Sequence, residues 1–445
     1  MGRIPNLAVR EERDSMDLAI HTLGCKLNQA ESAAIATDFE QSGFQVTALK
    51  EGGDVVLINS CTVTETADQE CRKLVRRALR ANPEAYVIVT GCYAQLRPEE
   101  VASIEGVDLV LGSAEKWRAL ELAGDMKKRD TPFVEVGDIG TSLTVGPGLT
   151  RPGADKTRAF LKVQDGCDYT CSFCTIPKAR GVSRSLPTAN VLKQAKTALM
   201  NGFREIVLTG VNLGDFGRKD GTTFYALLES LLTLRGLQRL KISSIEPNLL
   251  TDAIIDLAAS DARLLPHFHI PLQSGSDAIL GKMRRRYQSS LYAERVHSIC
   301  EKIPHAAIGV DVISGFPGET DQHFLETVRF LEDLPVAYLH PFTYSERADT
   351  PAAEMDSAVR RQERSRRTGV LRNLSEKKAE AFAWQQQGTV RPVLFESFLP
   401  DGRLVGWTDN YIKVSLHDPT VGPGDIRMIQ LGNRSHGITE GWIVP

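Results

Sequence analysis

GCDYTCSFCTIPKARG, which runs from Gly166 to Gly181, is the most informative stretch of this sequence. It places Cys167, Cys171 and Cys174 in a C-x3-C-x2-C arrangement directly after the apolar run RAFLKVQ. Such close spacing lets one loop wrap three thiolates around a single metal centre. A structural zinc site usually takes four protein ligands, and neither a second C-x2-C pair nor a histidine pair lies nearby. The spacing therefore favours a cubic 4Fe-4S cluster in which one iron keeps an open position.

The sequence around this loop alternates strand-like and helix-like runs from about Thr157 to about Thr343. Six strands of this kind fit a full or partial β/α barrel, whose active site lies at the carboxyl ends of the strands. The predicted strands are RAFLKVQ (158–164), REIVLTG (204–210), RLKISSI (239–245), HFHIPL (267–272), AAIGVDVIS (306–314) and AYLHPF (337–342). The predicted helices cover 188–201, 223–234, 251–259, 291–302 and 320–334.

Three further cysteines follow predicted strands nearer the amino terminus. The runs DLAIHTLG, DVVLINS and AYVIVTG end at Cys25, Cys61 and Cys92, with helices expected at Ala30 to Gln41 and Glu65 to Ala81. This rhythm predicts an open parallel α/β sheet. The carboxyl ends of parallel strands share one edge, so the three thiols should meet there. One buried cysteine after a strand is common packing, but three at equivalent positions favour a second metal centre.

The remainder of the chain separates these regions and adds a third. A Gly-, Pro- and Thr-rich stretch, 137–156, reads as a linker. A charged helix is expected from Ala358 to about Gln386, and short β-rich runs after Gly388 predict a small all-β barrel. We therefore expect an unassigned leader (1–16), an amino-terminal domain (17–140), a barrel domain (150–384) and a small β domain (385–445).

Composition sets the outer limits on function. At 445 residues the chain is too long for one hydrophobic core. No run approaches the roughly 20 apolar residues of a membrane span, and the polar start does not resemble a signal peptide, so we expect a cytoplasmic protein with no membrane partner. Eight cysteines in a reducing compartment favour metal ligation over disulfides. A net charge of −3 excludes a globally basic nucleic-acid coat protein, so RNA would be held by local patches.

The cysteine spacing, with Phe173 before the last cysteine, resembles the radical S-adenosylmethionine (SAM) superfamily. The resemblance implies that Cys167, Cys171 and Cys174 hold a catalytic 4Fe-4S cluster whose open iron is chelated by the amino and carboxylate groups of SAM. It implies that one electron from the cluster breaks the sulfonium bond and yields a 5′-deoxyadenosyl radical.

Later loops resemble the segments that hold SAM in that superfamily. LTGVNLG (208–214) resembles the loop that contacts the amino group of SAM. SSIEP (243–247) and PLQSGS (271–276) resemble the loops that hold its carboxylate and ribose. GVDVISGFPGET (309–320) resembles the loop that receives its adenine. Taken singly, each could be an ordinary strand-to-helix turn, and Glu246 could be only a helix cap. The implied cofactor contacts are Phe173, Thr209, Gly210, Asn212, Ser243, Glu246, Gln273, Ser274, Asp311, Gly315 and Phe316.

The front motifs extend the resemblance to the methylthiotransferases. HTLGCKLNQAES (21–32), INSCTVTETAD (58–68) and TGCYAQ (90–95) resemble their amino-terminal domain. This implies that Cys25, Cys61 and Cys92 hold an auxiliary 4Fe-4S cluster that carries the sulfur for the new bond. The tail resembles the TRAM domain that these enzymes use to hold RNA.

The first cysteine motif separates methylthiotransferases by target. TLGCKLNQAES resembles the group that modifies C2 of N6-threonylcarbamoyladenosine at position 37 of tRNA, whereas the others usually continue Gly-Cys with Gln-Met-Asn or Pro-Lys-Asn. The resemblance implies two SAM per turnover, a tRNA anticodon stem-loop as partner, and an electron donor such as flavodoxin or ferredoxin; a monomer is expected.

Alternatives stay open at this point. One is a methylthiotransferase acting on isopentenyladenosine or on a ribosomal-protein aspartate. Others are a radical enzyme with one cluster and a non-catalytic iron–sulfur or zinc protein that binds RNA.

Some features fit the resemblance less well. The tail from Gly388 contains five Lys or Arg against six Asp or Glu, so it lacks a basic surplus. YSERADTPAA (344–353) departs from the family's usual proline and glycine. Cys71 and Cys300 fall inside predicted helices and are expected to pack. Basic runs, each either a solvated helix face or an RNA contact, occur at Arg72, Lys73, Arg76, Arg77 and Arg80, at Lys282 with Arg284 to Arg286, and from Arg360 to Arg367.

Overall fold

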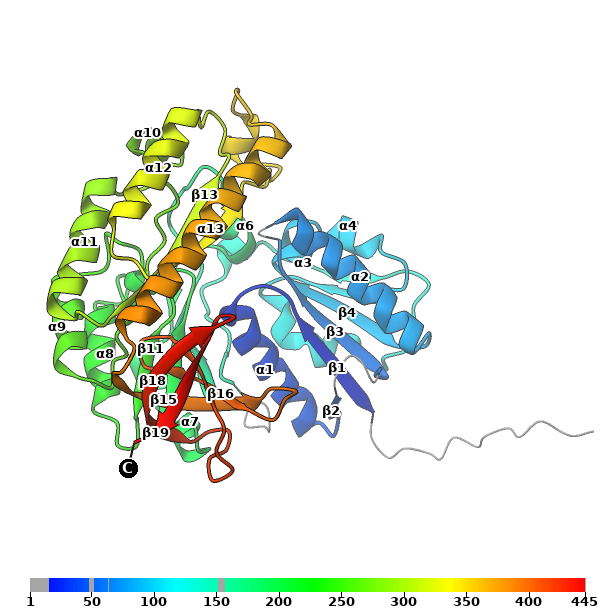
Figure 1. Ribbon diagram of the computed structural model, residues 1–445. Helices are drawn as coiled ribbons and strands as arrows, with labels where there is room; N and C mark the ends of the chain where they lie inside the picture. Colours follow the sequence, from blue (N-terminus) through cyan, green and yellow to red (C-terminus); the bar gives the residue numbers. More distant parts are fainter. Residues whose placement is uncertain (1–15, 48–51, 63, 151–156, 445) are drawn as a thin grey trace, which may run out of the picture.

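The computed structural model of the protein describes residues 16–47, 52–62, 64–150 and 157–444. Residues 1–15 of the expected leader and residues 151–156 of the expected linker lie outside the described residues. Figure 1 shows a parallel sheet with its helices in blue and cyan, a strand–helix barrel in green and yellow, and a small β-barrel in orange and red. The α/β class and the small all-β barrel predicted from the sequence are thus confirmed.

The amino-terminal sheet has six parallel strands in the order β2-β1-β3-β4-β5-β6. Every residue of β3 and β4 is buried, as continuous apolar runs require when helices cover both faces. The strands are β1 (Asp17–Thr22), β2 (Gln45–Thr47), β3 (Val55–Ser60), β4 (Tyr86–Gly91), β5 (Leu109–Leu111) and β6 (Phe133–Glu135). The helices are α1 (Lys26–Gln41), α2 (Glu65–Ala81), α3 (Cys92–Leu96), α4 (Pro98–Ala102) and α5 (Ala119–Ala123), with short 3-10 turns at Glu115–Arg118 and Ile139–Thr141.

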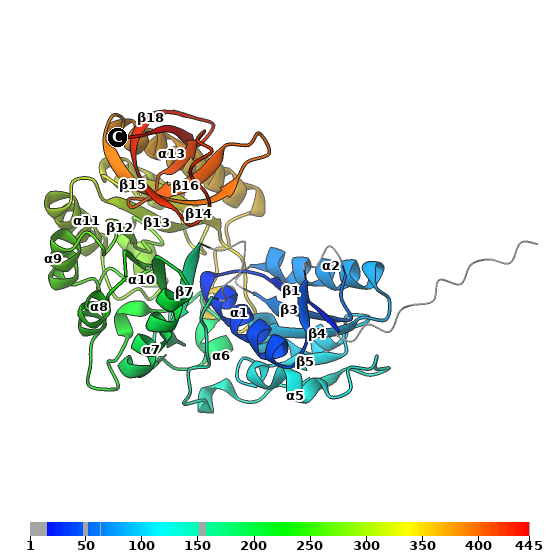
Figure 2. The same ribbon diagram turned by 90° about the horizontal axis from the view of Figure 1, so that it is seen from below.

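Helix α1 lies between the amino-terminal sheet and the barrel (Figure 2). It begins at Lys26 and not at Ala30 as predicted, because Cys25, with extended backbone, occupies the N-cap position. On its other side Ala30 packs against Phe160 and Val207, which point inward from the barrel strands. Helix α1 thus covers the open side of the barrel.

The barrel is partial and consists of two parallel three-stranded sheets, β11-β10-β7 and β12-β13-β14. An isolated bridge between Leu240 and Leu264 connects them. The strands are β7 (Arg158–Lys162), β10 (Glu205–Thr209), β11 (Arg239–Ile242), β12 (His267–His269), β13 (Ala307–Ser314) and β14 (Tyr338–Thr343), with a small hairpin of β8 (Gln164–Asp165) and β9 (Arg184–Ser185). The helices are α6 (Ile176–Arg180), α7 (Thr188–Met200), α8 (Phe224–Leu232), α9 (Asp252–Ser260), α10 (Asp277–Lys282), α11 (Ser289–Lys302) and α12 (Asp321–Asp333), with short 3-10 turns at Leu213–Asp215 and Pro351–Glu354.

Alternate residues of the barrel strands face opposite ways. Leu161, Leu208 and Leu240 belong to the large apolar core under the helices. Their sequence neighbours on the inward face are charged or polar in many cases, among them Lys162 and Lys241. The barrel interior is therefore built to hold polar groups and not a hydrophobic core.

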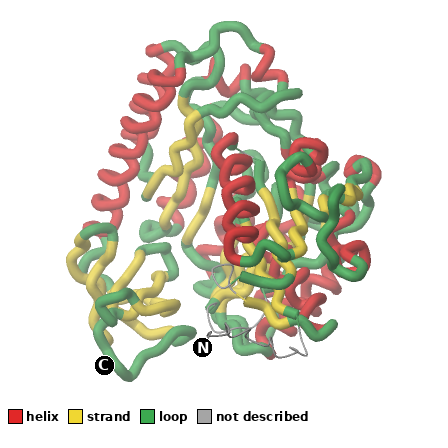
Figure 3. The backbone as a smooth tube through the Cα atoms, turned by 90° about the vertical axis from the view of Figure 1, so that its right-hand side faces the viewer, coloured by secondary structure: helices red, strands yellow, loops and turns green. Residues whose placement is uncertain are grey.

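A long helix, α13 (Arg361–Gln385), connects the barrel to the small β domain, and Figure 3 shows it along one edge of the molecule. The β domain is a closed barrel in the order β15-β16-β17-β19-β18. Its strands are β15 (Val390–Phe398), β16 (Leu404–Thr408), β17 (Lys413–Leu416), β18 (Ile426–Ser435) and β19 (Ile438–Ile443). It packs at the amino ends of the barrel strands, where the guanidinium of Arg239 donates to the carbonyls of Pro392 (3.2 Å) and Thr408 (3.1 Å).

None of the helices in the described residues is both long and apolar enough to cross a lipid bilayer.

Candidate active site

Three cysteines lie at one edge of the amino-terminal sheet. Cys25 precedes α1 after strand β1, Cys61 follows β3 directly, and Cys92 is the first residue of α3 after β4. Since β1, β3 and β4 are adjacent and parallel, their carboxyl ends bring the three residues together. None of the eight cysteines, all of which lie in the described residues, forms a disulfide.

Gly24 lets the loop that carries Cys25 pack closely against Cys61. Its φ is +90°, and a Cβ at this position would lie 2.7 Å from the Cβ and 2.8 Å from the Sγ of Cys61. A side chain is therefore excluded by both backbone conformation and space. Asn28 fixes the same contact, because its amide donates to the carbonyl of Leu23 (2.8 Å) and to that of Ser60 (3.1 Å).

The second triad occupies the loop between β7 and α6. Cys167 donates its N–H to the Gly181 carbonyl (3.1 Å), and the Cys174 N–H is bonded to the Cys171 carbonyl (3.1 Å), so the loop folds back on itself. Burial raises the pKa of Cys167 to about 11 and that of Cys174 to about 12. These thiols are therefore protonated at neutral pH, and binding a metal must release their protons.

A buried charge cluster joins the two triads. Glu31 of α1 binds Lys116 (2.6 Å), Lys162 of β7 (2.6 Å) and Arg180 of α6 (3.0 Å), and Asp165 binds Lys162 (2.7 Å) and Arg180 (3.0 Å). Arg184 also lies 3.8 Å from Asp165, so four cations meet two carboxylates in a nearly water-free joint. Arg180 also donates to Asn28. Burial raises the pKa of Cys92, and the nearby charge of Arg180 opposes this rise.

The loops that carry the two triads lie close together at this joint. Helix α3, which starts with Cys92, packs on α6, which follows Cys174. A cavity of about 270 Å³ lies between the loops that follow Cys61 and Cys174, lined in part by Thr62 and Thr175. Two three-thiol sites on facing loops suit two iron–sulfur clusters, each with one iron left open for another ligand.

The predicted SAM loop after β10 carries buried polar atoms with little hydrogen bonding. The Oγ1 of Thr209 and both ends of the Asn212 amide form no close hydrogen bond with the described residues, although the Asn212 side chain lies near the hydroxyl of Tyr169. Gln164 holds this loop beside the Cys167 loop, accepting from the N–H groups of Val211 and Asn212 (both 2.8 Å) and donating to the Gly166 carbonyl (2.8 Å). Unsatisfied buried groups of this kind fit a polar ligand such as the amino group of SAM.

Other predicted SAM residues line a cavity of about 200 Å³ beside the Cys167 loop. Phe173, Cys174, Gln273 and Asp311 form its walls. Gln273 takes a left-handed backbone (φ 68°), which turns the chain from β12 into this cavity. Phe173 packs edge-on against the buried ring of Phe316 at 6.4 Å.

The remaining predicted contacts have other partners or lie further out. Glu246 forms an ion pair with Arg285, and the hydroxyl of Ser274 lies 3.2 Å from that of Thr327. Gly315 (φ +77°) donates its N–H to Glu319 at 2.7 Å. Gly210 and Ser243 are half-buried at strand ends, next to the loops already described. Their predicted contacts with SAM stay predictions.

Arg285 is a site residue that the sequence reasoning missed. Its side chain is 4% exposed, pairs with Glu246 and donates to the Sγ of Cys171 at 3.2 Å. The sequence suggested only a basic run, for a solvated face or for RNA. The sequence offered one signal, the aromatic Tyr287 two residues later, which suggests a nearby core. The structure buries Tyr287.

The other basic runs contain both buried structural arginines and exposed arginines. Arg364 and Arg367 of α13 are buried, and Arg367 binds Glu319 at 2.7 Å, so these two are structural. The side chains of Arg76, Arg77 and Arg80 on α2 are exposed. In the 344–353 loop, Asp349 takes φ +64°, a backbone conformation that suits glycine better.

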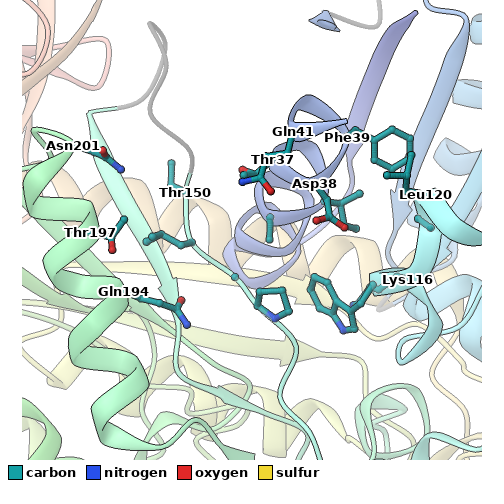
Figure 4. A pocket seen from close by; sticks show the side chains of 17 residues that line it. Thr37, Asp38, Phe39, Gln41, Lys116, Leu120, Thr150, Gln194, Thr197 and Asn201 are labelled. Atoms are coloured by element: carbon teal, nitrogen blue, oxygen red, sulfur yellow. The ribbon is translucent and has the colours of Figure 1, made fainter. Parts of the chain in front are cut away.

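A larger cavity of about 490 Å³ lies away from both triads, between α1 and α7 (Figure 4). Thr37, Asp38 and Gln41 of α1 line one side, and Gln194 and Thr197 of α7 the other. It contains no cysteine and is separate from the site. Cys71 packs in the core of the amino-terminal sheet, and Cys300 lies against the barrel core, as expected for packing residues.

Comparison with known proteins agrees with this geometry. Residues 17–112 match the model of the uncharacterized protein family UPF0004, and residues 161–331 match that of the Radical SAM superfamily. TsrM from Kitasatospora setae, a radical SAM methyltransferase, has a similar fold, with a TM-score of 0.53 and 16% identity over 76% of this chain and 77% of that one.

Full-length relatives are more similar. The Bacillus subtilis protein named threonylcarbamoyladenosine tRNA methylthiotransferase MtaB is 38% identical over 96% of both chains. Its Aquifex aeolicus namesake is 37% identical over 90% of this chain and 96% of its own. A tRNA-2-methylthio-N(6)-dimethylallyladenosine synthase from Clostridium botulinum is 30% identical over 87% and 88%.

The fold and the two triads define a radical SAM enzyme with an additional cysteine site. The chain belongs to the methylthiotransferase family that includes the MtaB proteins of Bacillus subtilis and Aquifex aeolicus. The resemblance drawn from the sequence is thereby confirmed, and with it the cofactor class of 4Fe-4S clusters and SAM.

Proposed function

We propose that this protein adds a methylthio group to C2 of N6-threonylcarbamoyladenosine at position 37 of tRNA. The observation that carries the proposal is the pair of thiol triads on neighbouring loops joined by a buried charge cluster, because the reaction needs a radical source and a sulfur source near one carbon. Relatives with this named substrate are 34–38% identical, against 30% for the dimethylallyladenosine synthase.

We assign each group of site residues a separate role. Cys167, Cys171 and Cys174 hold the cluster that binds SAM, and Cys25, Cys61 and Cys92 hold the auxiliary cluster. When bound, SAM and its cluster supply a radical able to remove hydrogen from C2, a bond that no side-chain acid or base attacks. Thr209 and Asn212 bind the amino end of SAM, and Gln164 keeps their loop beside the Cys167 loop.

We extend the proposal to stoichiometry and partners. Each turnover uses two SAM, one as methyl donor and one as radical source. The reductant is a small electron carrier such as flavodoxin or ferredoxin, and the enzyme acts as a monomer in the cytoplasm. The domain limits 17–140, 150–384 and 385–445 are part of the same proposal.

We propose that the RNA partner contacts aromatic groups of the β-barrel and of the end of α13. Trp442 on β19 is 53% exposed and Trp384 at the end of α13 is 75% exposed. Unpaired bases stack on such rings without a need for a basic surplus. A base in the anticodon loop is already unpaired, so it enters the site without opening a duplex.

The test uses enzyme purified without oxygen, reconstituted with iron and sulfide, and reduced with dithionite. An anticodon stem-loop carrying threonylcarbamoyladenosine should gain a methylthio group, detected by nucleoside mass spectrometry. Cys25→Ala should still cleave SAM but form no product, whereas Cys167→Ala should do neither. Product on an isopentenyladenosine stem-loop or a ribosomal peptide, with none on the threonylcarbamoyladenosine RNA, would contradict the proposal.

A further inference from the structure

Strand β14 points a row of ring side chains into the barrel. Leu339 packs into the outer core, so Tyr338, His340 and Phe342 share the inward face. Phe342 is 42% exposed and lines the cavity beside Cys174. His340 is exposed as well, so solvent reaches the barrel interior along this strand.

Side-chain contacts run from that cavity to the floor of the barrel. Asp311, in the cavity wall, lies 2.9 Å from the Nε2 of His269. The His269 ring is 5.3 Å from that of His340, which is 5.1 Å from Tyr338. Tyr338 is 5.7 Å from Tyr411, a residue of the small β-barrel. We call the inward-facing region around these five residues the barrel chamber.

Two lysines reach the barrel chamber from different domains. Lys26 is the first residue of α1, the helix that packs on strands β7 and β10 of the barrel. Lys241 of β11 is 3% exposed, and its Nζ lies 3.6 Å above the ring of Tyr411. Neither ammonium forms an ion pair or a hydrogen bond with any residue that the structure describes.

The acidic groups nearby compensate these lysines only in part. Glu205 already pairs with Arg239 (2.6 Å) and Glu396 with Arg158 (2.5 Å), and Asp311 lies 2.9 Å from the ring nitrogen of His269. Burial and the charge of Lys26 together hold the pKa of Lys241 well below its ordinary value. A buried ammonium without a counter-charge is unfavourable, and an anionic ligand would offset it.

A metal ion fits the barrel chamber less well. One donor atom each from His269, Asp311 and His340 lies within 4.8 Å of the others, a spacing that a cation could use. Two ammonium groups beside this trio would repel a divalent cation at short range. The excess charge favours an anion.

The threonylcarbamoyl arm has the matching chemistry, since it carries a carboxylate, a hydroxyl and urea N–H groups. In adenine, C2 and the N6 substituent lie on different edges of the ring. A base stacked on Phe342 with C2 towards the triads therefore directs its N6 arm away from them, into the barrel chamber.

We propose that the barrel chamber binds the threonylcarbamoyl arm, with Lys26 and Lys241 pairing with its carboxylate and Asp311 accepting from its N–H or hydroxyl groups. The proposal rests on the proposed function and names the residues that determine its specificity. An uncharged isopentenyl arm would leave both ammonium groups buried without a counter-ion, so it is selected against.

The test compares two stem-loops, one with the natural arm and one whose carboxylate is converted to the amide. Binding to the reconstituted holoenzyme is measured by fluorescence anisotropy. The wild type should bind the acid about tenfold or more tightly than the amide, as expected for loss of a hydrogen-bonded charge. Lys26→Met and Lys241→Met should each bind the acid about as weakly as the amide. Lys196→Met, an exposed lysine on α7, should behave as wild type.

Iron content and circular dichroism establish that each variant is loaded and folded. Full discrimination between acid and amide in both loaded lysine variants would overturn the proposal. Failure of the proposed function is distinguishable: the wild type would then form no methylthio product on the acid RNA, whatever the lysines contribute to binding.

Discussion

At the scale of single residues, the site depends on a glycine beside a cysteine. Gly24→Ala should abolish binding of the auxiliary cluster, because the added Cβ would collide with Cys61 at a position with φ +90°. Iron per chain should fall from about eight to about four, since each cubic cluster holds about four irons. Gly43→Ala is the matched control: it has φ +93° but open space around its Cβ, so it should keep both clusters.

Arg285 is a positioning residue for the second triad. Arg285→Gln should leave Glu246 without its counter-charge beside the Sγ of Cys171, so the cluster at Cys167 should load poorly and SAM cleavage should fall at least tenfold. Arg285→Lys keeps the charge but loses the forked geometry, and should recover part of the loading. Equal iron content and cleavage in wild type and Arg285→Gln would refute this role.

Some of these site residues could be predicted from the sequence, and others could not. Cys167, Cys171 and Cys174 were visible because one loop carries all three at ligand spacing. Cys25, Cys61 and Cys92 were visible because each ends a predicted strand. Arg285 and Glu31 were hidden, because a charged residue reads as exposed until its partner in a distant segment is known.

At the scale of elements, α1 joins two domains through Glu31. Glu31→Gln should destabilise the fold by about 3–5 kcal/mol, because Lys116, Lys162 and Arg180 would remain buried with too little negative charge. Urea unfolding measures the change. Asp38→Asn, at an exposed position of the same helix, is the control.

The difference in stability between wild type and Glu31→Gln should depend on pH. Burial alone would raise the pKa of Glu31, but Arg180, Lys116 and Lys162 outweigh it and hold the pKa well below its ordinary value. The stabilisation is thus complete above the unfolded pKa of about 4.3 and is lost as pH falls towards the folded pKa. The stability gap between wild type and Glu31→Gln should be constant from pH 7 to pH 5 and close below pH 4; a gap that widens on acidification would contradict this.

Long, strongly patterned elements were predictable and short ones were not. Helix α2 has the limits predicted, Glu65 and Ala81, since Thr64 caps it and its apolar residues recur at helical spacing. Strands β2, β5 and β6 have three residues each, too few to show a period. Helix α1 starts earlier than predicted because the cysteine loop, and not a Ser or Asp cap, defines its first turn.

At the scale of the whole molecule, we propose that aromatic rings of the β-barrel and of the end of α13 contribute RNA affinity. Replacing Trp384 and Trp442 together with alanine should weaken binding of the anticodon stem-loop by about 1–3 kcal/mol per lost base stack. SAM cleavage without RNA should be unchanged, because neither ring touches the triads. Unaltered RNA affinity would move the contact elsewhere, such as the exposed arginines of α2.

The central claim, that both triads serve methylthiolation of threonylcarbamoyladenosine in tRNA, is tested most directly in cells. Nucleosides from tRNA of a strain lacking this gene are analysed by mass spectrometry, with and without a plasmid copy. The deletion should contain threonylcarbamoyladenosine and no 2-methylthio derivative; the wild-type gene should restore it, and the Cys25→Ala and Cys167→Ala genes should not. Persistence of the 2-methylthio nucleoside in the deletion, or its restoration by either cysteine variant, would contradict the account.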